Sequence, residues 1–438
     1  MLSPTIQKEQ RSLDHTINKQ GNVFIERIPD KVYQQMVGVF SNEYHFQNGL
    51  ENGGRMRIAN YYVGLSRSLS DSFIRFIEEI EAGLSANKYP PFPAPEGFKP
   101  HEDNLLQTEL DSGFSFASFD MAVTEEGLQN IEFQAVSTYP ISAAKLNQSL
   151  LEHLHLENVF IFADSPATTW SDFTDLYKTI IAGDLSDGIV LTDRLLKQQK
   201  TNFEFYATQK ELDVPIDVVD LEDIVEENGE LFYPKPSMGE NPIKINRLYN
   251  RILLAEALFE DNYPEDAAIW KFRFDKKYPS LKFINHPIKL YEVSKRLSPY
   301  VDHPSNPDCF ELSAVSQDFQ NGVLKYEDYV WKHKWGGAGH QLILSPTQAI
   351  LSSLEGELDN YIVQKKVNFE VLKTGDGQDK IIELRFMTAH HEGKRIIVPM
   401  ARLGHVTEEE NNQKSFRIHF GENNKEGYGF SPVVIFED

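Results

Sequence analysis

The sequence predicts an α+β protein that is built from more than one lobe. Its 438 residues exceed the size of an ordinary single domain, and 40% of them are hydrophobic, which is enough to fill sizeable cores. Some stretches have apolar residues three and four apart, as helices do, whereas others are short apolar strands separated by glycine-containing turns. We therefore expect an N-terminal helical region, a small unit of parallel strands, and larger lobes built from strand hairpins.

The order of the predicted elements divides the chain into four segments. The N-terminal helical region is residues 1–100, and its proline-rich run at 89–95 cannot continue a helix or a central strand. Residues 101–180 contain a hairpin that carries carboxylates. Residues 181–275 read as an α/β unit, and residues 276–438 hold a second set of hairpins with lysines and glycines.

The α/β unit is predicted from the order of its elements. Residues 188–192, a helical stretch through Phe203 and Tyr206, and residues 214–219 follow one another as strand, helix and strand. A strand, a helix and a strand within about 35 residues are typical of a crossover between parallel strands. This segment is therefore expected to contain a small parallel sheet.

The charge of the chain restricts its partners. Its 43 basic and 66 acidic residues give a net charge of −23, whereas nucleic acid or an anionic membrane would require a clustered positive surface. Neither partner is expected, although a local basic pocket could still bind a nucleotide. No apolar run approaches the roughly 18 residues of a membrane-spanning helix. The polar start and the single cysteine lead us to expect a cytoplasmic protein.

The cysteine and two adjacent histidines have simpler explanations than catalysis or metal binding. Cys309 could be a nucleophile, but it follows Asn-Pro-Asp in a loop-like stretch and no patterned histidine lies near it. His390 and His391 could bind a metal, but neighbours on a strand point to opposite faces. A structural thiol and a polar hairpin tip are the better interpretations.

A carboxylate hairpin is predicted at residues 114–136. Two strands flank the turn Glu125-Glu126-Gly127, and on the second strand Glu132 and Gln134 point the same way because they are two residues apart. Asp120 near the end of the partner strand could reach the same face. An aspartate, a glutamate and an amide oxygen form an oxygen-only set that suits Mg²⁺. A solvated polar sheet face is the alternative interpretation.

A second hairpin combines lysines with glycines. Lys332 and Lys334 lie on one side of a strand that runs into the turn Gly336-Gly337-Ala338-Gly339. Glycines let the backbone turn tightly and bring bare N–H groups close to an anion, and the lysines add point charges. The pattern is compatible with phosphate binding, but a glycine-rich hairpin between two strands is more often only a tight turn. The spacing of a Walker loop is absent.

Two arginines could bind a substrate anion. Arg247 and Arg251 are four apart on a strand-like stretch, so in an extended chain they share a face and could project from a sheet edge. A surface ion-pair role is the alternative.

Taken in order, these motifs resemble the ATP-grasp superfamily. They are the carboxylate hairpin, the α/β unit, a lysine in a helix after Asn-x-Pro, the lysine and glycine hairpin, the strand Tyr-Ile-Val-Gln-Lys-Lys-Val and the strand Glu-Leu-Arg-Phe. The carboxylates precede the lysines, which resembles the circularly permuted branch that includes glutathionylspermidine-synthase-like proteins and glutathione-synthetase ATP-binding domains. The similarity spans roughly residues 110–405.

The resemblance implies a role for each matching residue. It makes Asp120, Glu132 and Gln134 the Mg²⁺ ligands, and Lys295 and Lys332 the lysines that contact the nucleotide phosphates. It also implies that Gly336, Gly337 and Gly339 form a flap over the phosphates, and that Gln364 with the backbone from Lys365 to Val367 contacts the adenine. Glu383 would contact the ribose or the metal, and Arg385 would contact the transferred phosphoryl group.

The implied activity is an ADP-forming, ATP-dependent ligation of a carboxylate to an amine through an acyl phosphate. The substrate would be a small carboxylate or peptide with an amine acceptor, and the cofactors ATP and Mg²⁺. The sequence departs from the family at Gln134, where an asparagine is usual. The longer amide can still present its oxygen, but the extra methylene moves that oxygen by more than the ~0.2 Å expected of a metal ligand. A catalytically inactive nucleotide- or peptide-binding protein is therefore the alternative.

Overall fold

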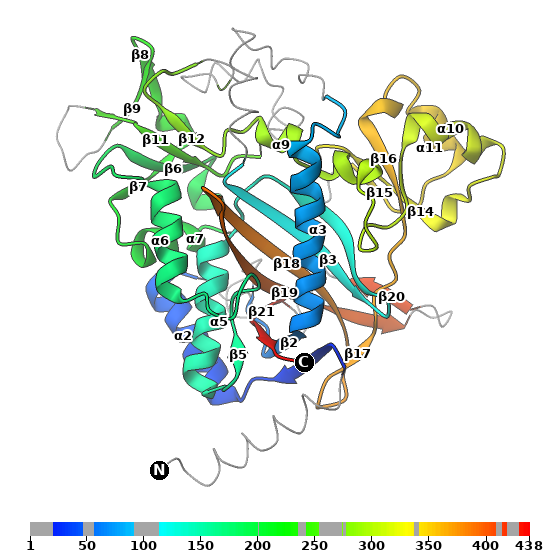
Figure 1. Cartoon of the computed structure of the whole chain (residues 1–438), viewed down its shortest axis with the longest axis horizontal. Helices are drawn as coiled ribbons and strands as arrows, with labels where there is room; N and C mark the ends of the chain where they lie inside the picture. Colours follow the sequence, from blue (N-terminus) through cyan, green and yellow to red (C-terminus); the bar gives the residue numbers. More distant parts are fainter. Residues whose placement is uncertain are drawn as a thin grey trace.

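The chain folds into a mixed α+β structure in which the strands of the described residues form five sheets (Figure 1). This computed structural model describes residues 21–46, 57–91, 114–199, 201–234, 242–253, 274, 277–336, 341–408, 414–417 and 429–438.

A seven-stranded sheet forms the centre of the molecule. Its main path is β20-β19-β18-β3-β4, with β17 paired to β18 and β21 paired to β19. All the pairings are antiparallel, and the long hairpin β18–β19 turns at Glu392 and Gly393. The strands are β3 (Phe116–Thr124), β4 (Gly127–Gln134), β17 (Leu372–Lys373), β18 (Asp379–His391), β19 (Lys394–Glu408), β20 (Lys414–Arg417) and β21 (Gly429–Ser431).

One face of this sheet is covered by helix α3 (Arg67–Ser85), which crosses β3 and β18 in Figure 1. Ser66 caps the N-terminus of the helix, because its side chain accepts a hydrogen bond from the Leu69 amide, and the apolar residues of the helix recur three and four apart. Phe73 stacks on Phe386 with ring centroids 3.8 Å apart and meets Phe119 edge-on. This face is therefore a closed aromatic core.

The opposite face is divided. Near the β18–β19 turn it is apolar and packs with α5 (Pro140–Leu154) and α6 (Trp170–Ile181), next to α2 (Asp30–Tyr44) and α7 (Phe203–Glu211). Further from the turn the face is charged. The candidate site lies on this charged half.

The α/β unit contributes β11, β6 and β7 to a four-stranded parallel sheet in the order β12-β11-β6-β7, and β12 comes from the segment that follows residue 275. The predicted strand, helix and strand are β6, α7 and β7, and the parallel pairing confirms the crossover. A small antiparallel sheet, β10-β9-β8, adjoins it in Figure 1. The strands are β6 (Ile189–Asp193), β7 (Ile216–Asp220), β8 (Val225–Glu227), β9 (Glu230–Tyr233), β10 (Ile243–Lys244), β11 (Arg247–Asn250) and β12 (Lys282–Ile284).

A further lobe projects beside the central sheet (Figure 1). Its antiparallel sheet, β13-β16-β14-β15, packs with two helices around Trp331 and Phe319. The predicted lysine hairpin is β14–β15, and the Gly337 to His340 part of its turn lies outside the described residues. The elements are β13 (Cys309–Glu311), α10 (Leu312–Gln320), β14 (Tyr329–His333), β15 (Leu342–Ile343), α11 (Gln348–Ser353) and β16 (Tyr361–Lys365).

Two local predictions need correction. The N-terminal region contains helices α2 and α3, but also β1 (Val23–Arg27) and β2 (Tyr61–Ser66), which join β22 (Val433–Phe436) and β5 (Val159–Phe160) in one sheet. The helix that was expected to carry the lysine after Asn-x-Pro, Lys295, is not one continuous helix. A single turn, α9 (Lys289–Glu292), is followed by extended residues and then by the 3-10 helix η5 (Lys295–Tyr300), which contains Pro299.

No helix among the described residues is long and apolar enough to cross a membrane.

The aromatic stack between α3 and the central sheet generates the first testable prediction. Phe73→Ala should lower the free energy of unfolding by about 3–5 kcal/mol, because it removes a fully buried ring and leaves a cavity. Arg75→Ala, on the exposed side of α3, is the matched control and should stay within about 0.5 kcal/mol of the wild type. Denaturant unfolding measures both, and equal losses would show that α3 does not anchor this face.

Candidate functional site

Seven ionisable residues meet on the charged half of the central sheet, and we name them the charged cluster. The sheet strands contribute the carboxylates and arginines, whereas the two lysines come from η5 and β14. Each member forms an ion pair or a hydrogen bond with a residue of the central sheet. The members are Asp120, Glu132, Lys295, Lys332, Glu383, Arg385 and Arg402.

The register of the strands explains how the acidic and basic groups meet. Asp120 on β3 lies opposite Arg385 on β18, and Glu383 on β18 lies opposite Arg402 on β19. Directly opposed residues in an antiparallel pair share a face. Glu383 and Arg385 are two apart on one strand, so all four side chains project from the same side.

Asp120 is the centre of this network. The Nε and Nη2 atoms of Arg385 donate to its two carboxylate oxygens at 2.6 and 2.5 Å, and the Nη2 atom of Arg402 donates at 3.2 Å. Arg402 also forms an ion pair with Glu383. Burial lowers the pKa of Arg385, but Asp120, together with Tyr139 and Glu132, raises it above its usual value. The guanidinium therefore remains charged in a nearly buried setting.

A β-bulge brings Glu132 to the same face. Asp120 pairs with Glu132, whereas the next residue, Met121, pairs with Asn130, so Ile131 has no partner on β3. Phe133 points into the core. Ile131, which strict alternation along the strand would place on the core side with Phe133, is instead the extra, half-buried residue of the bulge.

The two predicted phosphate lysines reach the bulged strand from other parts of the chain. The Nζ atom of Lys295 donates to Glu132 at 2.6 Å and also bonds to the carbonyl of Gly336. The Nζ atom of Lys332 donates to the carbonyl of Ile131 at 2.6 Å. The structure thus brings the lysine segments and the carboxylate hairpin together across a gap in sequence.

Lys332 is the cation with the least compensation. It is buried, and among the described residues it forms no ion pair with a carboxylate. Its other acceptor is the Oε1 atom of Gln364 at 2.5 Å. Burial lowers the pKa of Lys332 to about 8, and the nearby Lys295 acts in the same direction while Glu132 opposes it. A buried ammonium held by neutral oxygens is suited to receive an anion.

Other predicted residues lie outside the charged cluster. Gln134 is partly exposed and its side chain forms no hydrogen bond with a described residue. The Lys365 side chain is 58% exposed and faces Asp308 at 3.7 Å. Gly337 and Gly339 are not among the described residues.

The two predicted substrate arginines have separate surroundings. β11 is an inner strand of the parallel sheet and ends before Arg251, so the arginines do not project together from a sheet edge. Arg247 donates to the carbonyls of Ile180 and Ile181, and so provides hydrogen-bond donors for two carbonyls at the C-terminal end of α6. Arg251 turns towards the segment after β4, where it bonds to the carbonyl of Thr138.

Sequence reasoning missed Arg402 and Tyr139. The Oη atom of Tyr139 accepts a hydrogen bond from Arg385 at 3.0 Å. A usable signal existed for Arg402, because counting outward from the β18–β19 turn in an unbroken hairpin places it opposite Glu383. Tyr139 precedes α5, and its approach depends on how that helix packs, which no local pattern reveals.

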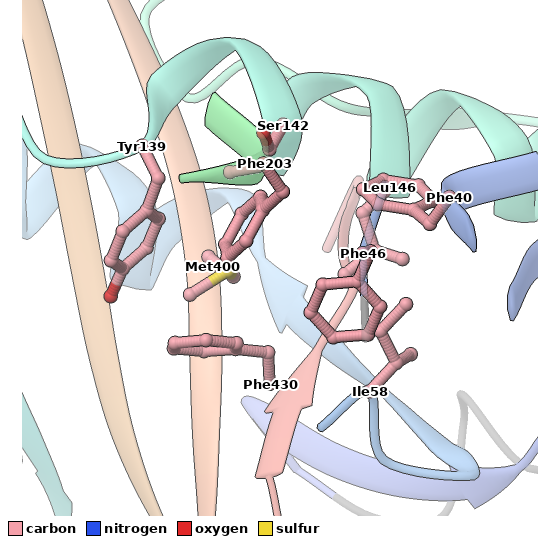
Figure 2. A pocket seen from close by; sticks show the side chains of 10 residues that line it. Phe40, Phe46, Ile58, Tyr139, Ser142, Leu146, Phe203, Met400 and Phe430 are labelled. Carbon is pink, nitrogen blue, oxygen red and sulfur yellow. The ribbon is translucent and has the colours of Figure 1, made fainter. Parts of the chain in front are cut away.

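Tyr139 is also one of the side chains that line a small apolar cavity (Figure 2). Its volume is about 10 Å³, room for no more than one water molecule, and its lining includes Phe203, Met400 and Phe430. We regard it as a packing void, not a ligand site.

A larger hollow of about 980 Å³ lies at the tip of the β18–β19 hairpin. His390 and His391 both line this hollow, but each has its own carboxylate partner. The imidazole of His390 lies 3.1 Å from the Glu81 carboxylate, and that of His391 lies 3.9 Å from the Glu392 carboxylate. Burial, aided by Arg395, lowers the pKa of His390 to about 3, so this imidazole is neutral.

No cluster of three or more histidine, cysteine, aspartate or glutamate side chains among the described residues is arranged to hold a metal ion. The predicted Mg²⁺ set contains only two such residues, and it relies on an amide for the third ligand. Cys309 is buried, which raises the pKa of its thiol to about 12. At neutral pH this thiol is protonated, so the structure supports the structural interpretation of the cysteine.

Among solved structures, a glutathione synthetase-like effector from Globodera pallida in its apo form is similar to this chain. The two share 12% sequence identity with a TM-score of 0.41, over 99% of this chain and 98% of that chain. No family model and no curated protein sequence matches the chain.

Removing the central carboxylate should destabilise the fold. Asp120→Ala would leave Arg385 and Arg402 buried without their shared acceptor, and we expect a loss of about 3–5 kcal/mol in the free energy of unfolding. Asp308→Ala removes an exposed carboxylate that faces Lys365, so it should cost no more than about 1 kcal/mol. If denaturant unfolding gave similar values for both variants, Asp120 would not be the centre of the network.

Proposed function

We propose that the protein is an ATP-dependent, ADP-forming ligase that joins a small carboxylate or peptide to an amine. The observation that carries the proposal is the charged cluster, in which four cations and three carboxylates converge on one sheet face. The excess cation, Lys332, lacks a carboxylate partner among the described residues, so the cluster suits an anionic ligand.

The cations fit a nucleotide triphosphate. Lys295 and Lys332 reach the same strand from two separate elements, and their present acceptors there, the Glu132 carboxylate and the Ile131 carbonyl, are oxygen atoms whose place phosphate oxygens could take. Charge-assisted hydrogen bonds to phosphate are among the strong interactions of this kind. We assign the two lysines to the nucleotide phosphates and Arg385 to the transferred phosphoryl group.

The carboxylates fit a magnesium ion. Asp120 and Glu132 are directly opposed and offer only oxygen atoms, which Mg²⁺ prefers, and Gln134 two residues further along could supply an amide oxygen. When bound, Mg²⁺ would neutralise charge on the phosphates of ATP. We assign these three residues to the metal and Glu383 to the ribose or the metal.

Further assignments follow the sequence prediction. Gly336 with Gly337 and Gly339 would cover the phosphates, and the β16 segment from Gln364 through Lys365 would face the adenine. Arg251 is the better placed of the two arginines for a substrate carboxylate, because it lies beside the segment that follows β4. A cytoplasmic location remains a prediction.

The chemistry needs no protein nucleophile. The substrate carboxylate attacks the γ-phosphorus, which forms an acyl phosphate and releases ADP; the amine then attacks the acyl carbon, which forms the C–N bond and releases phosphate and a proton. Catalysis of this kind depends on positioning and charge neutralisation. The protonated, buried thiol of Cys309 agrees with that requirement.

The second candidate function is nucleotide or peptide binding without turnover. It is favoured by the state of Asp120, both of whose oxygens are engaged by arginines, and by the unusual Gln134. A metal at this site must displace those contacts. ADP release separates the two functions: with ATP, Mg²⁺ and mixtures of amino acids or small peptides, the ligase should release ADP in an amine-dependent manner, whereas the binding protein should not.

Lys332→Ala should weaken ATP binding tenfold or more, because a charge-assisted contact is worth about 1.5–3 kcal/mol. Since the pKa of Lys332 is about 8, its charge is lost as the pH rises through that value, and wild-type affinity should fall over the same range. Calorimetry at several pH values measures both effects. Lys325→Ala, an exposed lysine before β14, is the control. Unchanged affinity in Lys332→Ala would exclude a phosphate contact.

Substitutions of Gln134 separate a working metal site from an abandoned one. Gln134→Asn should retain or raise Mg²⁺-dependent turnover, because the shorter amide restores the geometry that an octahedral ion prefers, whereas Gln134→Leu should lower it. Activity assays and Mg²⁺-dependent ATP titrations test this. If the wild type and both variants behaved identically, Gln134 would not be a metal ligand and the binding-protein function would be favoured.

A further inference from the structure

We infer that Gln364 is a positioning residue that holds the Lys332 ammonium at the bulge of β4. This inference rests on the proposed function, since Lys332 is there a phosphate contact. It assigns the Gln364 side chain to the lysine, and leaves only the backbone of β16 for an adenine contact.

The first observation is the use of the Gln364 amide. Its Oε1 atom accepts from Lys332 at 2.5 Å, and its Nε2 atom donates to the carbonyl of Asn130 at 3.0 Å. The side chain is 1% exposed, so both of its ends are occupied inside the protein. An amide with both ends engaged has one fixed orientation.

The second observation is the position of Lys332 relative to Gln364 on the β14–β16 sheet. Lys332 lies opposite Ile362 across β14 and β16, and Gln364 is two residues further along β16, so the two long side chains are diagonal neighbours on one face. Lys332 and Gln364 then bond to consecutive carbonyls of β4, those of Ile131 and Asn130. The pair therefore ties the β14–β16 lobe to the central sheet.

The third observation is the bulge itself. Ile131 is the residue without a partner on β3, so its carbonyl is available to an ammonium from outside the sheet. Glu132, the proposed metal ligand, follows directly. Gln364 thus fixes the ammonium one residue away from the carboxylate that would hold the metal, which sets the spacing between the phosphate contact and the metal.

A double-mutant cycle tests the inference. Gln364→Met removes both hydrogen bonds but keeps the length of the side chain, and we expect it to weaken calorimetric binding of a non-hydrolysable ATP analogue with Mg²⁺ about tenfold. Lys332→Ala should weaken binding by a similar factor. The double variant should bind no worse than Lys332→Ala, because Gln364 acts through the lysine. Gln317→Met, on the exposed side of α10, is the matched control and should bind like the wild type.

A purely structural role would give a different pattern. Additive losses in the double variant, or unchanged binding in Gln364→Met, would overturn the inference while leaving the proposed function in place. A wild-type protein that binds no nucleotide would overturn the proposed function and this inference together.

A stability cycle covers the case in which Gln364→Met folds poorly. Lys332→Met leaves the glutamine without its donor, and Gln364→Met leaves the ammonium without its acceptor, whereas replacing both removes the mismatch. The double variant should therefore lose less unfolding free energy than the two single variants summed. Gln364→Asn, which shortens the reach by a methylene, should lose as much nucleotide affinity as Gln364→Met. A simple sum of stabilities, or wild-type binding in Gln364→Asn, would contradict the positioning role.

Discussion

The structure depends on the mutual neutralisation of buried charges on one face of the central sheet. An isolated buried ion costs several kcal/mol, and removing one partner of a buried pair leaves that cost uncompensated. Asp120 is held by two arginines and Glu132 by Lys295, so the acidic and basic members of the charged cluster are stable only in each other's presence. These pairs join elements that are far apart in the sequence, namely the carboxylate hairpin, the β18–β19 hairpin and the η5 segment.

The same pairing has a consequence for ligands. A magnesium ion alone must compete with arginine and lysine for the carboxylates, and a nucleotide alone must compete with the carboxylates for the lysines. A magnesium nucleotide replaces both sets of partners at once, since its metal can take the carboxylates while its phosphates take the cations. On the proposed function, the ligand-free cluster is a neutralised site that favours the complete ligand over either component.

Much of the fold could be predicted from local patterns. The β18–β19 hairpin, the parallel crossover from β6 to β7 and the lysine hairpin follow from alternation, turn residues and spacing, which act over short distances. The strands β1 and β2 were missed because they are short and lie next to the helices α2 and α3, whose periodicity dominates this region. Their pairing is also long-range, since β1 pairs with β2 and β2 pairs with β22 at the other end of the chain.

The site was only partly predictable for a specific reason. An unbroken hairpin counted from the turn before Gly127 would pair Asp120 with Ile131 and turn Glu132 towards the aromatic core. The bulge shifts the register of β4 against β3 by one residue, and the sequence carries no clear sign of the bulge. Arg402 could have been found by counting, whereas the hydrogen bond between Lys332 and Gln364 depends on how β14 and β16 meet β4.

The most direct test of the central claim is the coupling between metal and nucleotide. Calorimetric titrations of the wild-type protein would compare a non-hydrolysable ATP analogue with and without Mg²⁺, and Mg²⁺ alone. If the charged cluster is the magnesium nucleotide site, binding should be tight only when both are present, and each component alone should bind weakly. Equal affinity for the analogue with and without Mg²⁺, or no binding in either case, would contradict the account.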